Sequence, residues 1–374
     1  MIGGIRIAKF FGFEVRLDLS WFVLFLLVLW TFAQSVFPAR HQGLSGTEYT
    51  LMALFGALIF FVSVLLHELA HSAVARARGI QVEGITLFIF GGVARIRSEA
   101  TNPKDEFLIT VVGPLSSAMI GLVLLGFARA GQAWGWPESV TGVADYLALL
   151  NFVLAVFNLI PGFPLDGGRL LRSLVWHLTK DLRKATRWAS LTGRGFGFIM
   201  IGLGILSLFG GQLISGIWLV FIGWFLAQAA VSSYRQLILK KILEGVRAEE
   251  AMTRNPETVM PDVTLRDLVN DYFLQRRYSV FPVQDQEGRL LGLITLSQVK
   301  QVDHDVWPTT RVEAVMTKIC ESVTVRPDDD LAEVLTKLEQ AGVGRAMVVE
   351  NGRLEGVISR ADVAAWLERY QQLH

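Results

Sequence analysis

The sequence predicts a polytopic α-helical membrane domain followed by a soluble α/β domain pair, and three observations support this fold class. The 374-residue chain is 52% hydrophobic and only 18% charged, whereas about a quarter of the residues in an average soluble protein are charged. The apolar residues are concentrated before about residue 234, and the remainder has the composition of ordinary soluble protein. That second part contains an internal repeat. The net charge of +1 predicts that the chain has no nucleic-acid partner.

Six apolar stretches in the first part have the character of membrane-spanning helices. They lie near residues 20–37, 49–75, 106–129, 144–160, 195–210 and 212–232. The fourth and fifth are shorter or interrupted by glycine, so their ends are the least well defined. Ahead of the first stretch, residues 4–19 alternate loosely and predict short extended segments.

Basic residues mark alternate connections between these stretches, which orients the chain in the membrane. The opposite connections hold little more than Arg40 and Arg129. The positive-inside rule therefore places both termini in the cytosol and predicts a multi-pass protein of the cell membrane. The basic residues are Arg6, Lys9 and Arg16, then Arg76, Arg78, Arg95, Arg97 and Lys104, then Arg169, Arg172, Lys180, Arg183, Lys184, Arg187 and Arg194, and finally Arg235, Lys240 and Lys241.

The second apolar stretch contains the sequence HELAH, which has the His-Glu-x-x-His pattern of zinc hydrolases. On a helix, His67 and His71 lie one turn apart on the same face, so both imidazoles can point at one metal ion. Glu68 lies about 100° around the helix axis, within reach of a water at the metal without being a ligand itself. The pattern therefore predicts a catalytic metal site.

This site is predicted to lie within the membrane, near its cytosolic side. Residues 51–66 are almost entirely apolar, and ionisable residues at membrane depth indicate a functional site by default. Arg76 and Arg78 follow His71 by one to two helical turns. At 1.5 Å per residue, His71 is then about 8–10 Å inside the cytosolic edge.

A catalytic zinc site usually takes three protein ligands, so a third ligand must come from elsewhere in the chain. Asp166 is favoured because it lies in NLIPGFPLDGG (158–168), at the cytosolic end of the fourth stretch, where prolines and glycines open the helix. Irregular backbone at membrane depth is tolerated only where protein or a water cavity surrounds it. The alternative for Asp166 is a helix cap over Gly167 and Gly168. The other candidates are Glu83, Glu99, Asp145 and His177.

Residues 80–96 read as extended strands with a turn or kink at Gly91 and Gly92. One interpretation is a short hairpin on the cytosolic side. The other is an edge strand beside the active site, which would offer unpaired backbone groups to a substrate in extended form. The sequence alone leaves both interpretations open.

The soluble part contains two copies of a motif of about 60 residues each. Residues 251–269 match 315–335, and residues 288–299 match 352–363. We therefore assign residues 1–234 to the membrane domain, 235–248 to a linker, and 249–305 and 306–374 to the two soluble domains. The single cysteine, Cys320, lies in this part and can form no intrachain disulfide.

HELAH followed by NLIPGFPLDGG resembles the site-2 protease family of intramembrane zinc metalloproteases. The second motif of that family has the form Asn-x-x-Pro-x-x-x-Leu-Asp-Gly, which residues 158–167 match. The resemblance implies one Zn²⁺ per chain, with His67, His71 and Asp166 as its ligands and Glu68 as the catalytic glutamate. It also implies Asn158 as a polar group near the scissile peptide. Gly113-Pro114 resembles the helix-packing segment of the family, where we expect glycine to permit close approach.

The paired repeats resemble CBS domains, which a subgroup of these proteases carries after six spans. The resemblance implies an adenine nucleotide of the ATP or AMP type between the copies, with ribose held by a Ser/Thr-x-x-Asp pattern. The second copy has this pattern at Ser359 and Asp362, whereas the first has Thr295 and Gln298. We therefore expect one nucleotide site. The alternative is a module that only dimerises or recognises substrate.

The predicted function is regulated intramembrane proteolysis of single-span transmembrane proteins within the lipid bilayer, by a chain that dimerises through its CBS domains. We expect Glu68 to move the proton of the attacking water and Asn158 to stabilise the oxyanion. A CBS-gated cation transporter or channel is the first alternative, with His67, His71 and Asp166 lining an ion path. An inactive scaffold of protease ancestry is the second.

Overall fold

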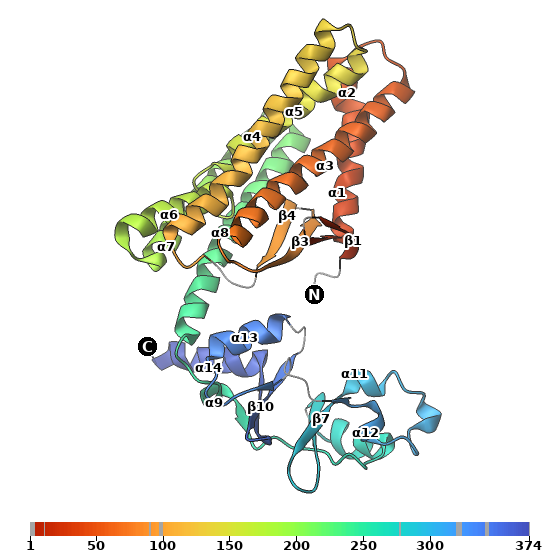
Figure 1. Ribbon diagram of the computed structural model, residues 1–374, viewed down its shortest axis with the longest axis vertical. Helices are drawn as coiled ribbons and strands as arrows, with labels where there is room; N and C mark the ends of the chain where they lie inside the picture. Colours follow the sequence, from red (N-terminus) through yellow and green to blue (C-terminus); the bar gives the residue numbers. More distant parts are fainter. Residues whose placement is uncertain are drawn as a thin grey trace. The chain divides into compact units, whose positions relative to one another are not determined.

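The computed structural model describes residues 4–10, 12–89, 91–96, 100–276, 278–318, 324–340 and 344–373. Glu99 and Cys320, both singled out by the sequence, lie outside these ranges. The chain divides into two compact units, Met1–Leu237 and Ile238–His374. Figure 1 shows a helical first unit with a small sheet and an α/β second unit.

Among the described residues, six helices are long and apolar enough to cross a membrane, which confirms the predicted spans. A shorter helix, α6 (Asp166–Thr179), follows the fourth of them. The spans are α1 with its continuation through a π-helical turn and α2 (Leu19–Arg40), α3 (Gly46–Ala77), α4 (Pro103–Ala133), α5 (Glu138–Asn158), α7 (Leu182–Phe209) and α8 (Leu213–Leu243).

The helix α7 begins well before the apolar stretch that predicted it. Asp181 caps its first turn by accepting a hydrogen bond from the Lys184 amide at 3.1 Å. The helix then runs through basic residues before it becomes apolar. The predicted stretch began later because hydropathy identifies only the apolar part of a helix and not the residue at which its hydrogen bonding begins. The last span also extends beyond its apolar part, and α8 includes most of the residues assigned above to a linker.

A four-stranded sheet lies beside the helices of the first unit, in the order β1-β2-β3-β4. Its inner face rests on α1 and α3, because buried Leu17, Ile85 and Leu87 contact Trp21 on α1 and Leu65 on α3. The strand β4 is last in this order, so one of its edges has no neighbouring strand among the described residues. The strands are β1 (Ile5–Phe10), β2 (Phe13–Leu17), β3 (Val82–Phe88) and β4 (Gly91–Ile96).

The loop between α5 and α6 carries the second sequence motif and is held against α7. The Phe163 amide donates a hydrogen bond to the Ala189 carbonyl at 3.0 Å. A Cβ atom at Gly193 would lie 2.1 Å from the Phe163 carbonyl oxygen, so only glycine permits this approach. The loop therefore has a defined support, and α6 starts from a fixed position.

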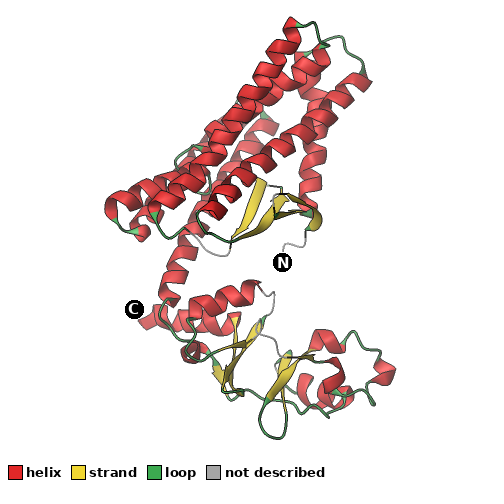
Figure 2. Cartoon of the chain, in the orientation of Figure 1, coloured by secondary structure: helices red, strands yellow, loops and turns green. Residues whose placement is uncertain are grey.

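The described residues of the second unit form two sheets, each with helices beside it (Figure 2). The copies exchange a short strand, because β5 (Thr253–Arg254) pairs with β11 (Arg353–Ser359) of the second copy and β8 (Thr317–Lys318) pairs with β7 (Leu290–Thr295) of the first. Leu290, Leu293, Met347 and Val357 form a shared apolar cluster. The remaining described α-helices and strands are α9 (Ala248–Ala251), α10 (Leu265–Asp267), β6 (Val280–Gln284), α11 (Leu296–Val299), α12 (Val312–Val315), β9 (Thr324–Val325), α13 (Leu331–Gln340), β10 (Arg345–Glu350) and α14 (Arg360–Leu373). A π-helical segment (Leu268–Phe273) and a 3-10 helix (His304–Val306) complete the unit's described helical segments.

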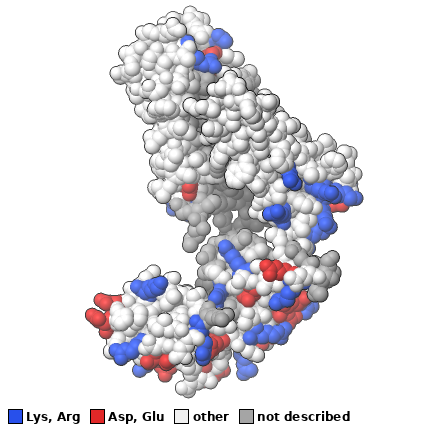
Figure 3. Space-filling model, turned by 180° about the vertical axis from the view of Figure 1, so that it is seen from behind, with Lys and Arg blue, Asp and Glu red and all other residues white. Residues whose placement is uncertain are grey.

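The distribution of charge on the first unit agrees with a membrane-spanning bundle. On the face seen in Figure 3, the helical bundle is white over its middle, and Lys and Arg gather where α6 meets α7. Side chains such as Leu122, Val153 and Leu203 are exposed on the bundle. Apolar side chains that face outward over a helical bundle are expected where lipid covers it.

Candidate metal centre

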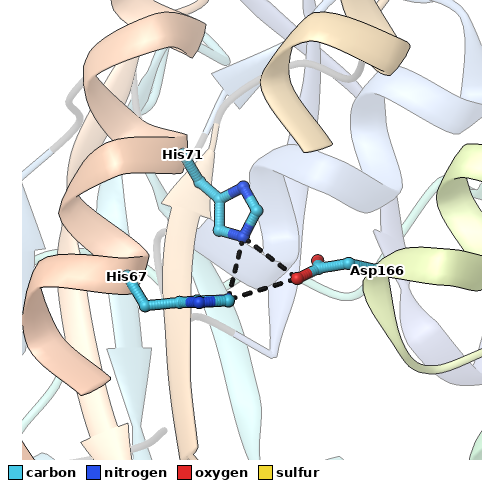
Figure 4. A group of neighbouring side chains, drawn as sticks. All are labelled: His67, His71 and Asp166. Atoms are coloured by element: carbon cyan, nitrogen blue, oxygen red, sulfur yellow. Dashed lines mark hydrogen bonds and ion pairs between the residues drawn. The ribbon is translucent and has the colours of Figure 1, made fainter. Parts of the chain in front are cut away.

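Two histidine side chains of α3 face one another in the interior of the helical bundle. His67 and His71 are only 4% and 8% exposed, and their Nε2 atoms lie 3.2 Å apart. The spacing of four residues on a continuous helix produces this arrangement, as the sequence predicts. Figure 4 shows both rings pointing toward the same place.

Asp166 completes this group from the first residue of α6. Its Oδ2 atom lies 3.2 Å from His67 Nε2 and 3.3 Å from His71 Nε2, so the three atoms form a nearly equilateral triangle. Around a tetrahedral zinc with bonds of about 2.0–2.1 Å, ligand atoms lie about 3.3–3.4 Å apart. The donor atoms therefore fit zinc, and three protein donors leave one position of the tetrahedron for a water or substrate.

The far nitrogens of both imidazoles have partners on α4. The Nδ1 atom of His71 lies 2.6 Å from the Ile109 carbonyl oxygen and donates to it, which leaves Nε2 unprotonated in a neutral ring. The Nδ1 atom of His67 lies 2.9 Å from Ser117 Oγ. Such outer partners orient histidine ligands in metal sites. Sequence reasoning missed both, because neither a backbone carbonyl nor a lone serine carries a pattern.

Gly113 lies on α4 between these two partners. A Cβ atom there would be 2.1 Å from His71 Nε2 and 2.8 Å from His67 Nε2. The sequence predicts a close approach at this glycine, and the structure identifies the imidazole rings as the groups that approach it. Any side chain at position 113 would displace at least one ring.

Glu68 and Asn158 line one cavity of about 800 Å³ together with His67, His71 and Asp166. The wall of this cavity is mostly apolar and comes largely from α1, α3, α5 and α8, together with Phe88 and Ile89 at the end of β3 and Gly91 and Gly92 of β4. A Cβ atom at Gly92 would lie 2.3 Å from Glu68 Cγ, so the start of β4 directly adjoins this glutamate. The structure thus brings together all five residues that the sequence places at the active site.

The other candidate ligands lie elsewhere or are outside the description. Asp145 forms an ion pair with Arg129 at 3.6 Å, and His177 is exposed on α6. The side chain of Glu83 is outside the described part of the chain, as is all of Glu99. Among the described residues, His67, His71 and Asp166 are the one group of three or more His, Cys, Asp or Glu side chains close enough to hold a metal.

In the second unit, the proposed nucleotide residues form a reciprocal cap at the start of α14. The Ser359 amide and hydroxyl donate to Asp362 Oδ2 at 2.8 and 2.6 Å. The Oδ1 atom of Asp362 accepts a hydrogen bond from Thr253 of the first copy at 3.1 Å. Gln298 occupies the equivalent position of the first copy and donates to Thr317 of the second at 2.7 Å. The two contacts between the copies, Asp362 with Thr253 and Gln298 with Thr317, thus differ in that only the first contains a carboxylate.

Two family models match this chain, and several known proteins are similar to it in sequence. The model of peptidase family M50 matches residues 55–141 and 129–202, and that of the CBS domain matches 248–305 and 312–369. The putative zinc metalloprotease Rip3 of Mycobacterium tuberculosis is 34% identical over 99% of this chain and 94% of its own. The putative zinc metalloprotease sll0528 of Synechocystis is 35% identical over 98% and 96%. The solved site-2 protease of Methanocaldococcus jannaschii is 32% identical over 62% of this chain and 95% of its own, with a TM-score of 0.42.

The six described helices of membrane-span type and the group formed by His67, His71 and Asp166 are the features expected of a membrane-embedded metalloprotein. The chain belongs to peptidase family M50, the site-2 proteases, and carries a tandem pair of CBS domains at its C-terminal end. It is a zinc metalloprotease. This family membership favours the predicted protease function over the alternative function of a cation transporter or channel.

Gly113→Ala is expected to lower zinc affinity, because the new methyl group occupies the space of the His71 ring. The matched control is Gly126→Ala on the same helix, where a Cβ atom meets nothing within 4 Å. Zinc content after dialysis against a chelator, measured by mass spectrometry, compares the two variants. Equal zinc retention in Gly113→Ala and wild-type protein would contradict the packing described here.

Proposed function

We propose that this protein hydrolyses peptide bonds inside transmembrane segments of membrane-anchored proteins, with zinc held by His67, His71 and Asp166. The observation that carries the proposal is the triangle of donor atoms at 3.2–3.3 Å within a cavity walled by spanning helices. The apolar wall of the cavity suits an apolar substrate, and the transmembrane segment of a single-span protein carries mostly apolar side chains. The lipid bilayer is therefore both the surroundings of the enzyme and the source of its substrate.

The residues of the cavity have distinct roles in this proposal. When bound, zinc polarises the scissile carbonyl and activates a water for attack. Glu68 takes a proton from the attacking water and delivers it to the leaving amine. The Asn158 amide donates a hydrogen bond to the oxyanion that develops on the substrate. Arg76 and Arg78, which follow the histidines on α3, support a cytosolic location of the active site and of both termini.

A transmembrane helix hides its own carbonyls, so the substrate has to unwind locally before cleavage. The open edge of β4 is suited to hold the unwound segment, since it begins at Gly91 and Gly92 on the wall of the cavity. Pairing with this edge would replace the helical hydrogen bonds that the substrate loses. In this proposal β4 is the substrate clamp.

Glu68→Gln is expected to keep its zinc and to lose cleavage by roughly 10²–10⁴-fold, because the amide cannot accept the proton of the water. The assay uses the full-length protein in detergent or liposomes with a single-span substrate, together with metal analysis of the same sample. Asp145→Asn is the matched control, since it neutralises a carboxylate of α5 that pairs with Arg129. Wild-type protein that yields no peptide products would favour a transporter and contradict the proposal.

Proline scanning of β4 tests the clamp. Adjacent backbone amides of a strand point to opposite edges of that strand. Of the two variants Val93→Pro and Ala94→Pro, one therefore loses an N–H group that faces β3, and the other loses an N–H group at the open edge of β4. The open-edge variant is expected to keep its thermal stability and its zinc, and to cleave the transmembrane substrate more slowly. Val93→Ala and Ala94→Ser are controls that retain the amide. Unchanged cleavage in both proline variants would argue against the clamp.

We also infer that the CBS pair binds one adenine nucleotide, with Ser359 and Asp362 at its ribose. Asp362 supports this because its carboxylate lies at a junction of the two copies, whereas Gln298 at the other junction has no charge. Titration of the full-length protein with AMP and ATP is expected to give one site per chain, which Asp362→Ala weakens and Gln298→Ala does not. Light scattering of the same samples tests dimerisation through the CBS domains.

A further inference from the structure

One face of α4 holds both histidine rings of the proposed metal site. Ile109 accepts the hydrogen bond of His71, Ser117 contacts His67, and Gly113 makes room for both rings. These residues recur every four positions, which places them on one face of the helix. Glu106 lies three residues before Ile109 and extends the same face toward the start of α4.

Glu106 is a fully buried carboxylate whose partners lie on α6. It is 0% exposed, and its Oε1 atom accepts a hydrogen bond from Arg172 Nε at 2.6 Å. A second nitrogen of Arg172 also contacts Oε1, and Arg169 Nε lies 3.9 Å away. The guanidinium of Arg172 further lies 5.3 Å from the ring of Phe163, in the loop that leads to Asp166. Arg172 thus connects α4 both to α6 and to the loop before it.

Stability alone gives a weak reason for this ion pair. Removing two charges from water often costs more than their attraction returns, and apolar replacements of buried pairs are frequently neutral or stabilising. The second oxygen, Glu106 Oε2, has no hydrogen-bond partner among the described residues, which adds to the cost. A pair with an unsatisfied oxygen suggests a function that depends on where it places α6.

We infer that Glu106 is a positioning residue for the metal centre, acting through Arg172. The pair fixes the first turns of α6 against α4, and Asp166 is the first residue of α6. The same face of α4 also orients the imidazoles of His67 and His71. The positions of all three donor atoms are therefore fixed by contacts with α4 before the metal binds. This inference rests on the proposed zinc site and adds the element that preorganises it. Outer contacts of this kind are commonly worth about 10–100-fold in metal affinity.

The test is the zinc affinity of the purified full-length protein, measured by chelator competition, together with the melting temperature of the metal-free form. Glu106→Gln is expected to weaken zinc binding about 10–100-fold and to change the visible spectrum of the Co²⁺-substituted protein. The double variant Glu106→Leu/Arg172→Leu removes both charges of the buried pair, and Arg169, which also loses Glu106 as a partner, is 29% exposed. The double variant is therefore expected to melt near the wild-type temperature while its zinc affinity stays low.

Arg172→Lys keeps a positive charge without the planar fork, so its zinc affinity is expected to fall between those of wild type and Glu106→Gln. Asp145→Asn is the control for loss of a carboxylate, and it is expected to bind zinc like wild type. Wild-type affinity in the double variant, with any loss confined to melting temperature, would overturn the inference and leave the zinc site standing. A wild-type protein that binds no zinc would overturn the zinc site itself, and the inference with it.

Discussion

The proposed metal centre depends on the close approach of the Asp166 carboxylate to two imidazoles that belong to a different helix. The period of α3 brings His67 and His71 together without further help. Asp166 is separated from His67 by 99 positions in sequence, so its place depends on how the chain leaves α5 and starts α6. The loop between them is held by its hydrogen bond to Ala189 and by the close approach of Gly193. The position at which α6 starts is therefore as important for the proposed metal site as the identity of the proposed ligands.

The surroundings of this site explain why so many of its polar groups have protein partners. Inside a membrane domain there is little water to satisfy buried donors and acceptors, so their partners must be built into neighbouring helices. The helix α4 supplies the Ile109 carbonyl and the Ser117 hydroxyl, and in our inference Glu106 extends the same support to α6. One helix without a metal ligand would then set the geometry of all three ligands.

The sequence predicted those features that follow from local periodicity. The six spans follow from runs of apolar residues, and the positions of His67 and His71 follow from their spacing. Asp166 was predictable because Pro161, Gly162 and Pro164 before it interrupt the helix at membrane depth, where helical backbone is otherwise required. The sheet beside α3 was also predictable, since residues 80–96 read as strands.

Features that depend on contact between helices were out of reach of the sequence. Gly113 was recognised as a site of close approach, but the imidazoles that approach it depend on the register of α3 against α4. The pairing of Glu106 with Arg172 joins residues 66 positions apart and leaves no local signature. The choice between a plain hairpin and an edge strand at the site likewise required the sheet order and the contact of Gly92 with Glu68.

The most direct test of the central claim is zinc X-ray absorption spectroscopy of the purified full-length protein and its Asp166→Ala variant. We expect one zinc per chain with two imidazole ligands and oxygen ligands at about 2.0–2.2 Å in the wild type. We also expect this signal to be lost or altered in Asp166→Ala and retained in His177→Ala. A zinc environment that is the same in Asp166→Ala as in the wild type would contradict the central claim.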